Sequence, residues 1–426
     1  MKVLIITYYW PPAGGSGVQR WLKFVKYLQD FGVEPIVYTV DNPNYALTDE
    51  SLQKEVPDNI QVIKQPIFEP NTIFSFFKKK NKKTSAGFLA QKPGVINKIM
   101  HYVRANYFIP DARKFWIKPS VNYLSTYLKK NPVSAIITTG PPHSLHIIGY
   151  QLRKQLNLKW LADFRDPWTD IDYFHHLPLS KKAKEKHFKL EKTVLETADI
   201  TLVVGETMKR NYQKYTDNIH VITNGFDTKM STDESTTLDT KFTLTHIGLM
   251  NADRNPTILW KVLDQLCKEI KGFSDDLEVV LVGSIAEEVN NELNGYNNIS
   301  VDRVGYLPHK EVQFYQRKSQ VLLLSVNNVP SAKGIITGKI FEYLQAKRPI
   351  LAIGPTDGDL AAILNKTQSG VIVNFDDIDN LKVNIQKLYE QYKNNTLTTQ
   401  SVNISSYHRK KLTEQLANII KQTVKS

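Results

Sequence analysis

Short apolar runs alternate along the chain with segments in which apolar residues recur at helical spacing. In the first half the strand-like runs are 3–7, 34–39, 135–138, 159–162, 200–204 and 220–222, and amphipathic segments such as 18–30 and 143–155 lie between them. Because these runs are apolar on both faces, they are typical of parallel strands that helices cover on two sides. The pattern therefore predicts a parallel sheet within an α/β domain.

The same alternation begins again after a polar interruption. Residues 227–240 are rich in Ser, Thr and Asp, which predicts a linker. Beyond it we expect strands at 243–247, 278–282, 299–303, 321–325, 349–352 and 370–373, and helices at 256–270, 310–319 and 338–346. A basic amphipathic segment, 401–426, comes last. The chain is thus expected to hold two doubly wound α/β domains, at 1–226 and 241–400, and a C-terminal helix.

Size and composition agree with this organisation. At 426 residues the chain exceeds the size at which a single hydrophobic core stops growing. Its one cysteine, Cys267, allows no internal disulfide, as is usual in a reducing cytoplasm. The apolar runs are too short to cross a bilayer, and Pro11 and Pro12 interrupt the first run before it can serve as a signal peptide. These features predict a cytoplasmic protein that is not integral to a membrane.

The positive charge lies entirely in the first half of the chain. The net charge is +13, and residues 1–230 contain 33 Lys and Arg against 20 Asp and Glu, whereas residues 231–426 contain 22 of each. This asymmetry predicts an anionic partner, which could be a membrane surface, an acidic substrate or nucleic acid.

One segment of the first half, 71–88, combines aromatic residues with a run of lysines. The lysines are Lys78, Lys79, Lys80, Lys82 and Lys83. Rings at the interface and ammonium groups among the head groups would suit an anionic membrane. A solvated surface loop is the alternative, and nucleic acid is disfavoured because no recognition module accompanies the lysines.

Residues 14–17, Gly-Gly-Ser-Gly, lie between the first expected strand and the first expected helix. A dinucleotide-binding fingerprint is disfavoured, because Arg20 occupies the position of its third glycine and residues 8–13 separate the loop from the strand. The glycines could simply provide a turn with positive φ. They also leave backbone N–H groups free at a helix start, where an anion or a sugar hydroxyl can bind.

The second half holds two further candidate anion sites. In the first, Gly248 follows a strand and Arg254 precedes a helix, so that the guanidinium can reach phosphate oxygens at the carboxyl edge of the sheet. In the second, residues 337–339, Thr-Gly-Lys, begin a helix that carries Glu342. A helix N-terminus with a lysine favours a diphosphate, and a carboxylate can accept both hydroxyls of a ribose. A Walker loop is excluded, because Lys333 stands where its first glycine is required.

The order of these motifs resembles glycosyltransferase family 4, a family of retaining enzymes with the GT-B fold. The resemblance covers nearly the whole chain, and its most specific part is 338–350, where Phe341-Glu342-Tyr343 and Pro349 match the donor-site helix and the strand after it. The segments that carry it are the glycine-rich loop, ITNGFD, HIGLMNADRNP, VVLVGS, VDRVGYLPHKEVQFYQ, TGKIFEYLQAKRPILA and GPTDGDLAAILNKTQSGVIV. It implies two Rossmann-like domains that face a cleft, with the C-terminal helix returning to the first domain.

The resemblance also implies residue roles, with the donor in the second domain. Glu342 matches the glutamate that holds the donor ribose, Arg254 lies where a basic residue grips the diphosphate, and Lys339 with the Gly338 amide would complete that grip. The family's pattern is Glu, seven residues, Glu, and here its first position is Gly334, which leaves the donor sugar open. The other residues expected at the donor are Gly14, Gly15, Ser16, Gly248, Gly305, Tyr306, Leu307 and Thr337.

Four polar residues of the first domain follow expected strands and are candidates for the acceptor side. His143, Asp163, Arg165 and Asp166 should lie at the carboxyl edge of the sheet. We expect Asp163, Arg165 and Asp166 to bind the acceptor, and His143 and Asp166 to join the cationic residues in catalysis. The alternatives are a structural ion-pair cluster for the aspartates and a helix-capping role for His143.

The sequence thus predicts a retaining glycosyltransferase that uses a UDP-, GDP- or dTDP-sugar and no other cofactor. Because no His/Cys cluster at metal-ligand spacing is present, we expect the reaction to need no metal. The acceptor would be a lipid-linked bacterial surface glycan, such as lipopolysaccharide, capsule or exopolysaccharide, reached from the cytoplasmic face of the inner membrane. Two alternatives stay open: a sugar-nucleotide epimerase of the same fold, and a non-catalytic glycan-binding relative, for which Gly334 is the best argument.

Overall fold

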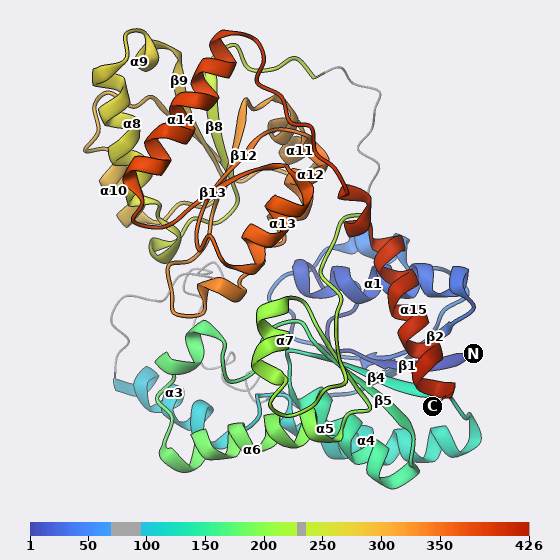
Figure 1. Cartoon of the computed structure of the whole chain (residues 1–426). Coiled ribbons are helices and arrows are strands. Elements are labelled where there is room, and N and C mark those ends of the chain that lie inside the picture. Colours follow the sequence, from blue (N-terminus) through green and yellow to red (C-terminus); the bar gives the residue numbers. More distant parts are fainter. Residues whose placement is uncertain (70–94, 228–235, 426) are drawn as a thin grey trace. The chain divides into compact units, whose positions relative to one another are not determined.

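A computed structural model describes residues 1–69, 95–227 and 236–425 of the chain. The polypeptide divides into two compact units, coloured along the sequence in Figure 1. The first unit contains the described residues up to Asp227 together with the segment from Tyr407 onward, and the second contains the described residues between these two points. The lysine-rich segment 71–88 and residues 228–235 of the expected linker lie outside the described residues.

The first unit is built on a seven-stranded parallel sheet in the order β3-β2-β1-β4-β5-β6-β7. β1 pairs with β2 and β4, and its Val3 lies opposite Pro35 of β2 and Ala135 of β4. The strands are β1 (Lys2–Ile6), β2 (Glu34–Val40), β3 (Gln61–Gln65), β4 (Ala135–Gly140), β5 (Lys159–Phe164), β6 (Ile200–Val203) and β7 (Ile219–Val221). The sequence predicted all of them except β3, whose Lys64 and two glutamines hide its apolar pattern.

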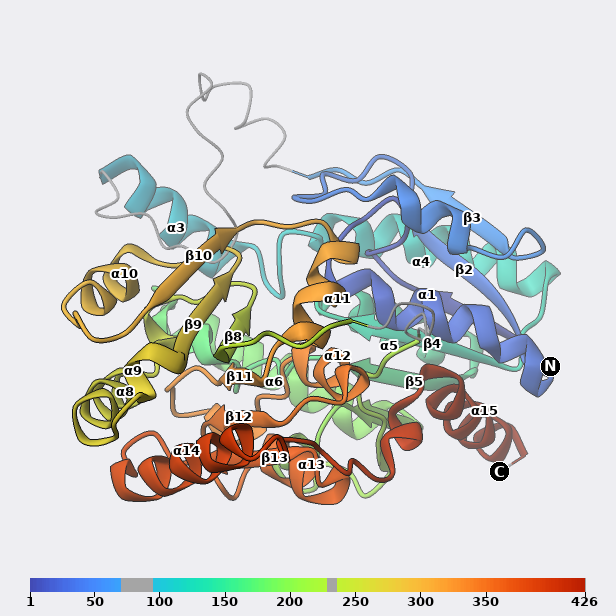
Figure 2. The same ribbon diagram turned by 90° about the horizontal axis from the view of Figure 1, so that it is seen from above.

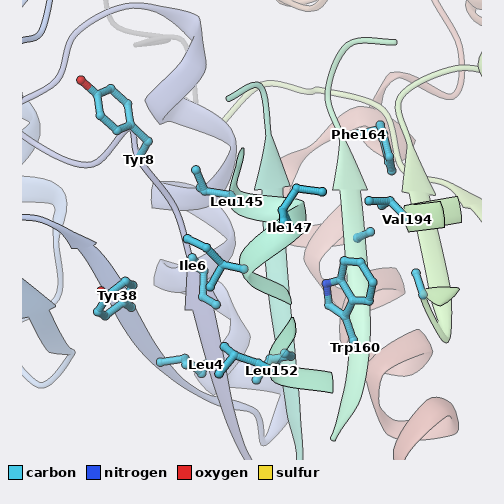
Figure 3. Close-up of a cluster of buried hydrophobic side chains, with 14 of the residues drawn as sticks. Leu4, Ile6, Tyr8, Tyr38, Leu145, Ile147, Leu152, Trp160, Phe164 and Val194 are labelled. Carbon is cyan, nitrogen blue, oxygen red and sulfur yellow. The ribbon is translucent and has the colours of Figure 1, made fainter. Parts of the chain in front are cut away.

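Helices cover both faces of this sheet, as Figures 1 and 2 show. Alternate residues of each strand enter two different cores: Leu4 and Ile6 pack with Trp160 in one, and Val3 and Ile5 lie in the other. Figure 3 shows the first of these cores, with Leu145 and Leu152 of α5 above the strands. The helices are α1 (Ser16–Leu28), α3 (Val95–Tyr107), α4 (Lys114–Lys130), α5 (Ser144–Leu156), α6 (Lys181–Thr197) and α7 (Glu206–Tyr212). This double cover explains why the strands are apolar throughout.

The C-terminal helix α15 (Arg409–Lys425) belongs to the first unit, where it packs against α1. Leu416 and Ile420 enter the core on that face of the sheet. The two chain segments that lead out of and back into the unit are hydrogen-bonded, because the Phe226 amide donates to the carbonyl of Tyr407 and the Arg409 amide donates to the carbonyl of Phe226. The expected return of this helix to the first domain is therefore confirmed.

The second unit contains a six-stranded parallel sheet in the order β10-β9-β8-β11-β12-β13. Its strands are β8 (Phe242–Ile247), β9 (Leu277–Val282), β10 (Val301–Gly305), β11 (Val321–Ser325), β12 (Ile350–Ile353) and β13 (Gly370–Val373). Its helices are α8 (Thr257–Glu269), α9 (Phe273–Asp276), α10 (Glu287–Leu293), α11 (His309–Lys318), α12 (Lys339–Ala346), α13 (Asp359–Thr367) and α14 (Ile378–Lys393). All six strands were predicted, with β10 shifted by two residues.

In both sheets the strand order reverses beside the first strand, between β1 and β4 and between β8 and β11. This is the order of doubly wound Rossmann-like folds, in which ligands bind outside the carboxyl ends of the strands at the reversal. The predicted fold class, two doubly wound Rossmann-like domains, is therefore confirmed. Among the described residues, no helix combines the length and the apolar character that crossing a membrane requires.

Candidate active site

The candidate donor site lies at the carboxyl edge of the second sheet, where the ends of β8 and β9 approach closely. Gly248 and Gly283 follow these strands with φ values of 109° and 116°, a conformation that residues with side chains rarely adopt. A Cβ atom on Gly283 would lie 2.7 Å from the Gly248 carbonyl oxygen, and one on Gly248 would lie 2.7 Å from Cε of Lys339. Both glycines are therefore required for the backbone and Lys339 to approach each other.

Lys339, the first residue of α12, is held over Gly248 by a histidine of β8. Its Nζ lies 3.2 Å from Nε2 of His246, which is completely buried. Burial and the nearby Arg254 lower the pKa of Lys339 to about 7, and Glu342 acts in the opposite direction.

His246 is suited to accept a hydrogen bond from this lysine. Burial, followed by the charges of Lys339 and Arg254, holds its pKa well below the ordinary value, although the carbonyls of Leu249 and Leu323 raise it. The imidazole is therefore neutral, and an ammonium group can donate only to a ring nitrogen that carries no proton. The geometry assigns that role to Nε2, with the proton on Nδ1.

Arg254 ends the turn between β8 and α8, and two contacts fix its guanidinium. Nε donates to Oδ1 of Asn327 over 3.0 Å, and Nη1 donates to the carbonyl of Leu249 over 2.9 Å. Lys339 packs over Gly248, and Arg254 contacts the carbonyl of the next residue, Leu249, so the two cations lie near each other. Two neighbouring cations at the carboxyl edge of a sheet favour a ligand with more than one negative charge.

The start of α12 adds an open space beside Gly338 and a carboxylate. The Thr337 hydroxyl accepts a hydrogen bond from the Lys339 amide over 3.2 Å, and a Cβ on Gly338 would meet no other atom within 4 Å. One turn further along, Oε2 of Glu342 accepts a hydrogen bond from Gln316 of α11 over 3.0 Å. The helix start is thus open to an anion, with the Glu342 carboxylate fixed one turn away.

The expected base-binding residues lie at the end of the neighbouring strand β10. The amide of Gly283 donates to the carbonyl of Gly305 over 2.6 Å, which joins this segment to the end of β9. Gly305 has a φ of 75°, and the side chain of Tyr306 beyond it is 90% exposed. Leu307 follows directly, so this stretch, Gly248 and β9 lie along one edge of the sheet.

Sequence reasoning missed the residues that hold these groups in place, namely His246, Gln316 and Asn327. The first left a signal, because a histidine inside the strand-like run 242–247 is expected to be buried and therefore needs a partner. Gln316 and Asn327 left none, since their roles depend on which element packs beside α12 and β8.

In the first unit the glycine-rich loop is fixed by backbone and arginine contacts. The Gly14 amide donates to the carbonyl of Leu47 over 2.9 Å, and Gly15 has a φ of 84° just before α1 begins. Arg165 donates to the carbonyl of Gly17 over 2.6 Å and to the carbonyl of Pro141 at the end of β4. The side chain of Ser16 lies outside the described residues.

Asp163 is completely buried at the end of β5 and is surrounded by donors. It accepts hydrogen bonds from Nη2 of Arg20 over 2.9 Å, from Nε1 of Trp21 over 2.7 Å and from the hydroxyl of Thr139 over 2.8 Å. Burial opposes its ionisation, but Arg20 and the hydrogen bonds hold its pKa below the ordinary value. This is the arrangement of a structural ion pair, which the sequence left as the alternative.

His143 is also buried, and it packs in an aromatic stack. Its ring lies parallel to that of Trp168, with centroids 4.5 Å apart, and burial holds its pKa well below the ordinary value. Its side chain makes no capping hydrogen bond at the start of α5. Asp166, in contrast, is exposed to solvent. Of His143, Asp163 and Asp166, only Asp166 can reach a ligand without rearrangement.

Comparison with solved structures relates this geometry to known proteins. The sequence itself matches no protein-family profile and no curated protein. The sucrose-phosphate synthase of Thermosynechococcus elongatus superposes with a TM-score of 0.61 at 16% identity, over 99% of this chain and 98% of that one. HepE of Anabaena, solved in complex with UDP-glucose, superposes with a TM-score of 0.56 at 11% identity, over 100% of this chain and 98% of that one. WaaG, a glycosyltransferase involved in lipopolysaccharide biosynthesis, superposes with a TM-score of 0.54 at 12% identity, over 98% of this chain and 99% of that one. The chain therefore has the GT-B fold of these proteins along its whole length.

Proposed function

We propose that this protein is a retaining glycosyltransferase that takes a sugar from a nucleoside diphosphate. The observation that carries the proposal is the pair of cations at the carboxyl edge of the second sheet, Arg254 and Lys339, each fixed by a partner of its own. The open space at Gly338, at the start of α12, lies beside them. The fold supports the same function, because the proteins that share it include glycosyltransferases.

The proposed chemistry is departure of the diphosphate from the anomeric carbon of the donor sugar. The bond between this carbon and the phosphate oxygen breaks, and its electrons stay on the diphosphate. Lys339, Arg254 and the amide at Gly338 would stabilise the resulting charge, and Glu342 would hold the ribose. The acceptor hydroxyl then bonds to the anomeric carbon on the same face of the sugar, and its proton passes to an oxygen of the departing phosphate. Asp166 of the first unit is the residue we propose for holding the acceptor.

The acceptor we propose is a lipid-linked bacterial surface glycan. The positive charge of the first half of the chain supports an acceptor at an anionic surface. The similarity in fold to WaaG, a protein of lipopolysaccharide biosynthesis, supports the same class of acceptor. The protein would then work at the cytoplasmic face of the inner membrane.

One observation favours a second candidate, a non-catalytic glycan-binding protein. Gly334 stands in a short turn, Ala332–Gly334, where the resemblance requires the carboxylate that contacts the donor sugar. A protein that had lost catalysis could keep the nucleotide-binding cations and lose this group.

A panel of UDP-, GDP- and dTDP-sugars separates the candidates. A transferase is expected to gain thermal stability with one nucleotide class and to hydrolyse that donor slowly in the absence of acceptor, whereas a binding relative gains stability without hydrolysis. An epimerase would convert the donor sugar and release no nucleoside diphosphate. The matched controls are Lys339→Met, which should lose the thermal shift, and Lys261→Met on the exposed side of α8, which should keep it. No thermal shift with any nucleotide would overturn the proposal.

A further inference from the structure

Helix α3 of the first unit presents an apolar stripe to solvent. Ile99, Tyr102, Val103 and Tyr107 follow one another at helical spacing on one face, and the exposed fractions of Ile99 and Tyr107 are 58% and 67%. No described side chain of α3 belongs to the buried core clusters of the unit. A helix in a globular domain ordinarily turns such a stripe inward, so this one is expected to meet a partner.

Aromatic side chains of neighbouring segments extend this stripe. The Lys114 ammonium donates to the Tyr107 carbonyl over 2.5 Å and lies 5.1 Å from the ring centre of Phe115. Phe115 is exposed and contacts Phe68, which is exposed as well, with ring centroids 5.6 Å apart. The α3 face and these two rings together form what we call the α3 surface.

The cations around the α3 surface have no acidic partners. Lys98 and Arg104 flank the stripe on α3, Lys118 follows Phe115 on α4, and Lys186 of α6 lies near enough to Lys114 to help burial lower its pKa. None of these five forms an ion pair with a described residue. The whole stretch 70–162 contains 16 Lys and Arg and a single acidic residue, Asp111.

Two carboxylates near the α3 surface are already engaged. Asp111 accepts hydrogen bonds from the amide and the hydroxyl of Ser144, each over 2.8 Å, at the start of α5. Glu69 is buried and pairs with Arg113 over 3.1 Å. On α6, Glu185 stands among Lys181, Lys182, Lys184 and Lys186. Positive charge therefore predominates around the apolar stripe, and the surface is complementary to a partner that is both apolar and anionic.

We propose that the α3 surface docks this protein on a bilayer that contains anionic lipids. Ile99 and Val103 would enter the interface with the tyrosine rings, while Lys98 and Arg104 reach the head groups. A second copy of the chain is disfavoured, because two like-charged surfaces repel. Single-stranded nucleic acid is disfavoured as well, because no recognition-module signature accompanies these cations and the aliphatic Ile99 and Val103 cannot stack on bases. The inference rests on the proposed function in one respect, which is that the acceptor is linked to a lipid.

The test is co-sedimentation of the full chain with two kinds of vesicle, phosphatidylcholine alone and an equimolar mixture with phosphatidylglycerol. The parent is expected to bind the mixed vesicles and to bind the neutral ones weakly. The double variant Ile99→Ser, Val103→Ser should bind the mixed vesicles about tenfold more weakly, because it removes apolar area from the interface. Its matched control is Ile378→Ser, Val383→Ser, which changes two exposed side chains of α14 in the second unit and should bind like the parent.

A second pair of variants tests the charge. Replacing Lys98, Arg104 and Lys118 with serine should weaken binding about a hundredfold, since each cation near an anionic surface contributes about fivefold. The control variant replaces the exposed residues Lys261, Lys271 and Lys387 with serine, so that it has the same net charge as the first variant. Its binding to the mixed vesicles should change little. If the two triple variants lose vesicle binding equally, the proposal is overturned. It is also overturned if the double variant Ile99→Ser, Val103→Ser binds the mixed vesicles as well as the parent does.

A third variant tests whether the lysine-rich segment 71–88, and not the α3 surface, binds the membrane. If neutralising Lys78, Lys79, Lys80, Lys82 and Lys83 abolishes vesicle binding while the α3 variants bind normally, the α3 surface is not the docking site. Binding of UDP-glucose, measured on the same proteins without vesicles, should be unchanged in all of them. Loss of the membrane result alone therefore leaves the proposed function intact, and loss of nucleotide binding alone leaves the membrane inference intact.

Discussion

Binding of a nucleotide-sugar to the second unit should depend on pH through Lys339. Burial and Arg254 lower the pKa of this lysine to about 7, so its ammonium form is lost as the pH rises through that value. A bound diphosphate favours the ammonium form and raises the pKa again, so binding takes up a proton. His246 does not titrate in this range, because its pKa lies well below the ordinary value.

The size of the effect follows from the pKa of Lys339. If the diphosphate binds only the ammonium form, affinity for UDP-glucose should fall about tenfold between about pH 6 and pH 8, and tenfold, or ~1.4 kcal/mol, for each further unit. Near neutral pH about half a proton should be taken up for each UDP-glucose bound. UDP-glucose is a suitable probe because its diphosphate is esterified at both ends and carries no titrating proton of its own there.

Isothermal titration calorimetry in buffers of different ionisation enthalpy measures both the affinity and the proton uptake. Lys339→Met should bind more weakly than the parent in mild acid, by about 1.5–3 kcal/mol for a lost charge-assisted hydrogen bond, and its affinity should not change with pH. Lys261→Met is the control and should reproduce the parental slope. Equal parental affinities at the two ends of the range, or a parental slope in Lys339→Met, would refute this account of Lys339.

Three further predictions concern the framework of the two units. Asp163→Asn leaves its arginine partner buried without a counter-charge, so the free energy of unfolding should fall by about 3–5 kcal/mol in urea titrations, whereas Asp166→Asn at the exposed neighbour should change it little. Gly283→Ala would place a Cβ atom 2.7 Å from the Gly248 carbonyl, and should weaken UDP-glucose binding at least about tenfold in calorimetry; normal binding would show that this close approach is unnecessary. Burial lowers the pKa of His146 to about 3, so the unfolded chain binds a proton that the folded chain excludes, and stability should fall below about pH 6.5 by ~1.4 kcal/mol per unit; a His146→Gln variant should lose part of this dependence, and an unchanged dependence would contradict it.

The sequence predicted the fold because most elements carry their own local signal. Strands buried on both faces carry few charged residues and are mostly apolar, and this made β1, β4 and β8 visible without any knowledge of their neighbours. β3 has one neighbour, β2, and lies at the edge of the sheet, so its exposed face is polar and its pattern was missed.

The candidate site was predicted only in part, because its geometry depends on contacts between distant segments. Glycines and cations at strand ends pointed to Gly248, Arg254 and Lys339, and the structure places these three together. The burial of Asp163 could not be foreseen, since its partner Arg20 lies 143 residues away along the chain. The support that His246 gives to Lys339 likewise spans 93 residues, and no local pattern records it.

The most direct test of the proposed function is a crystal structure of the protein with UDP-glucose. We expect the diphosphate oxygens within hydrogen-bond distance of Nζ of Lys339 and of the Arg254 guanidinium, with the ribose hydroxyls on the Glu342 carboxylate. Electron density for the nucleotide at another place, or a second unit that stays empty at saturating UDP-, GDP- and dTDP-sugar, would contradict the account.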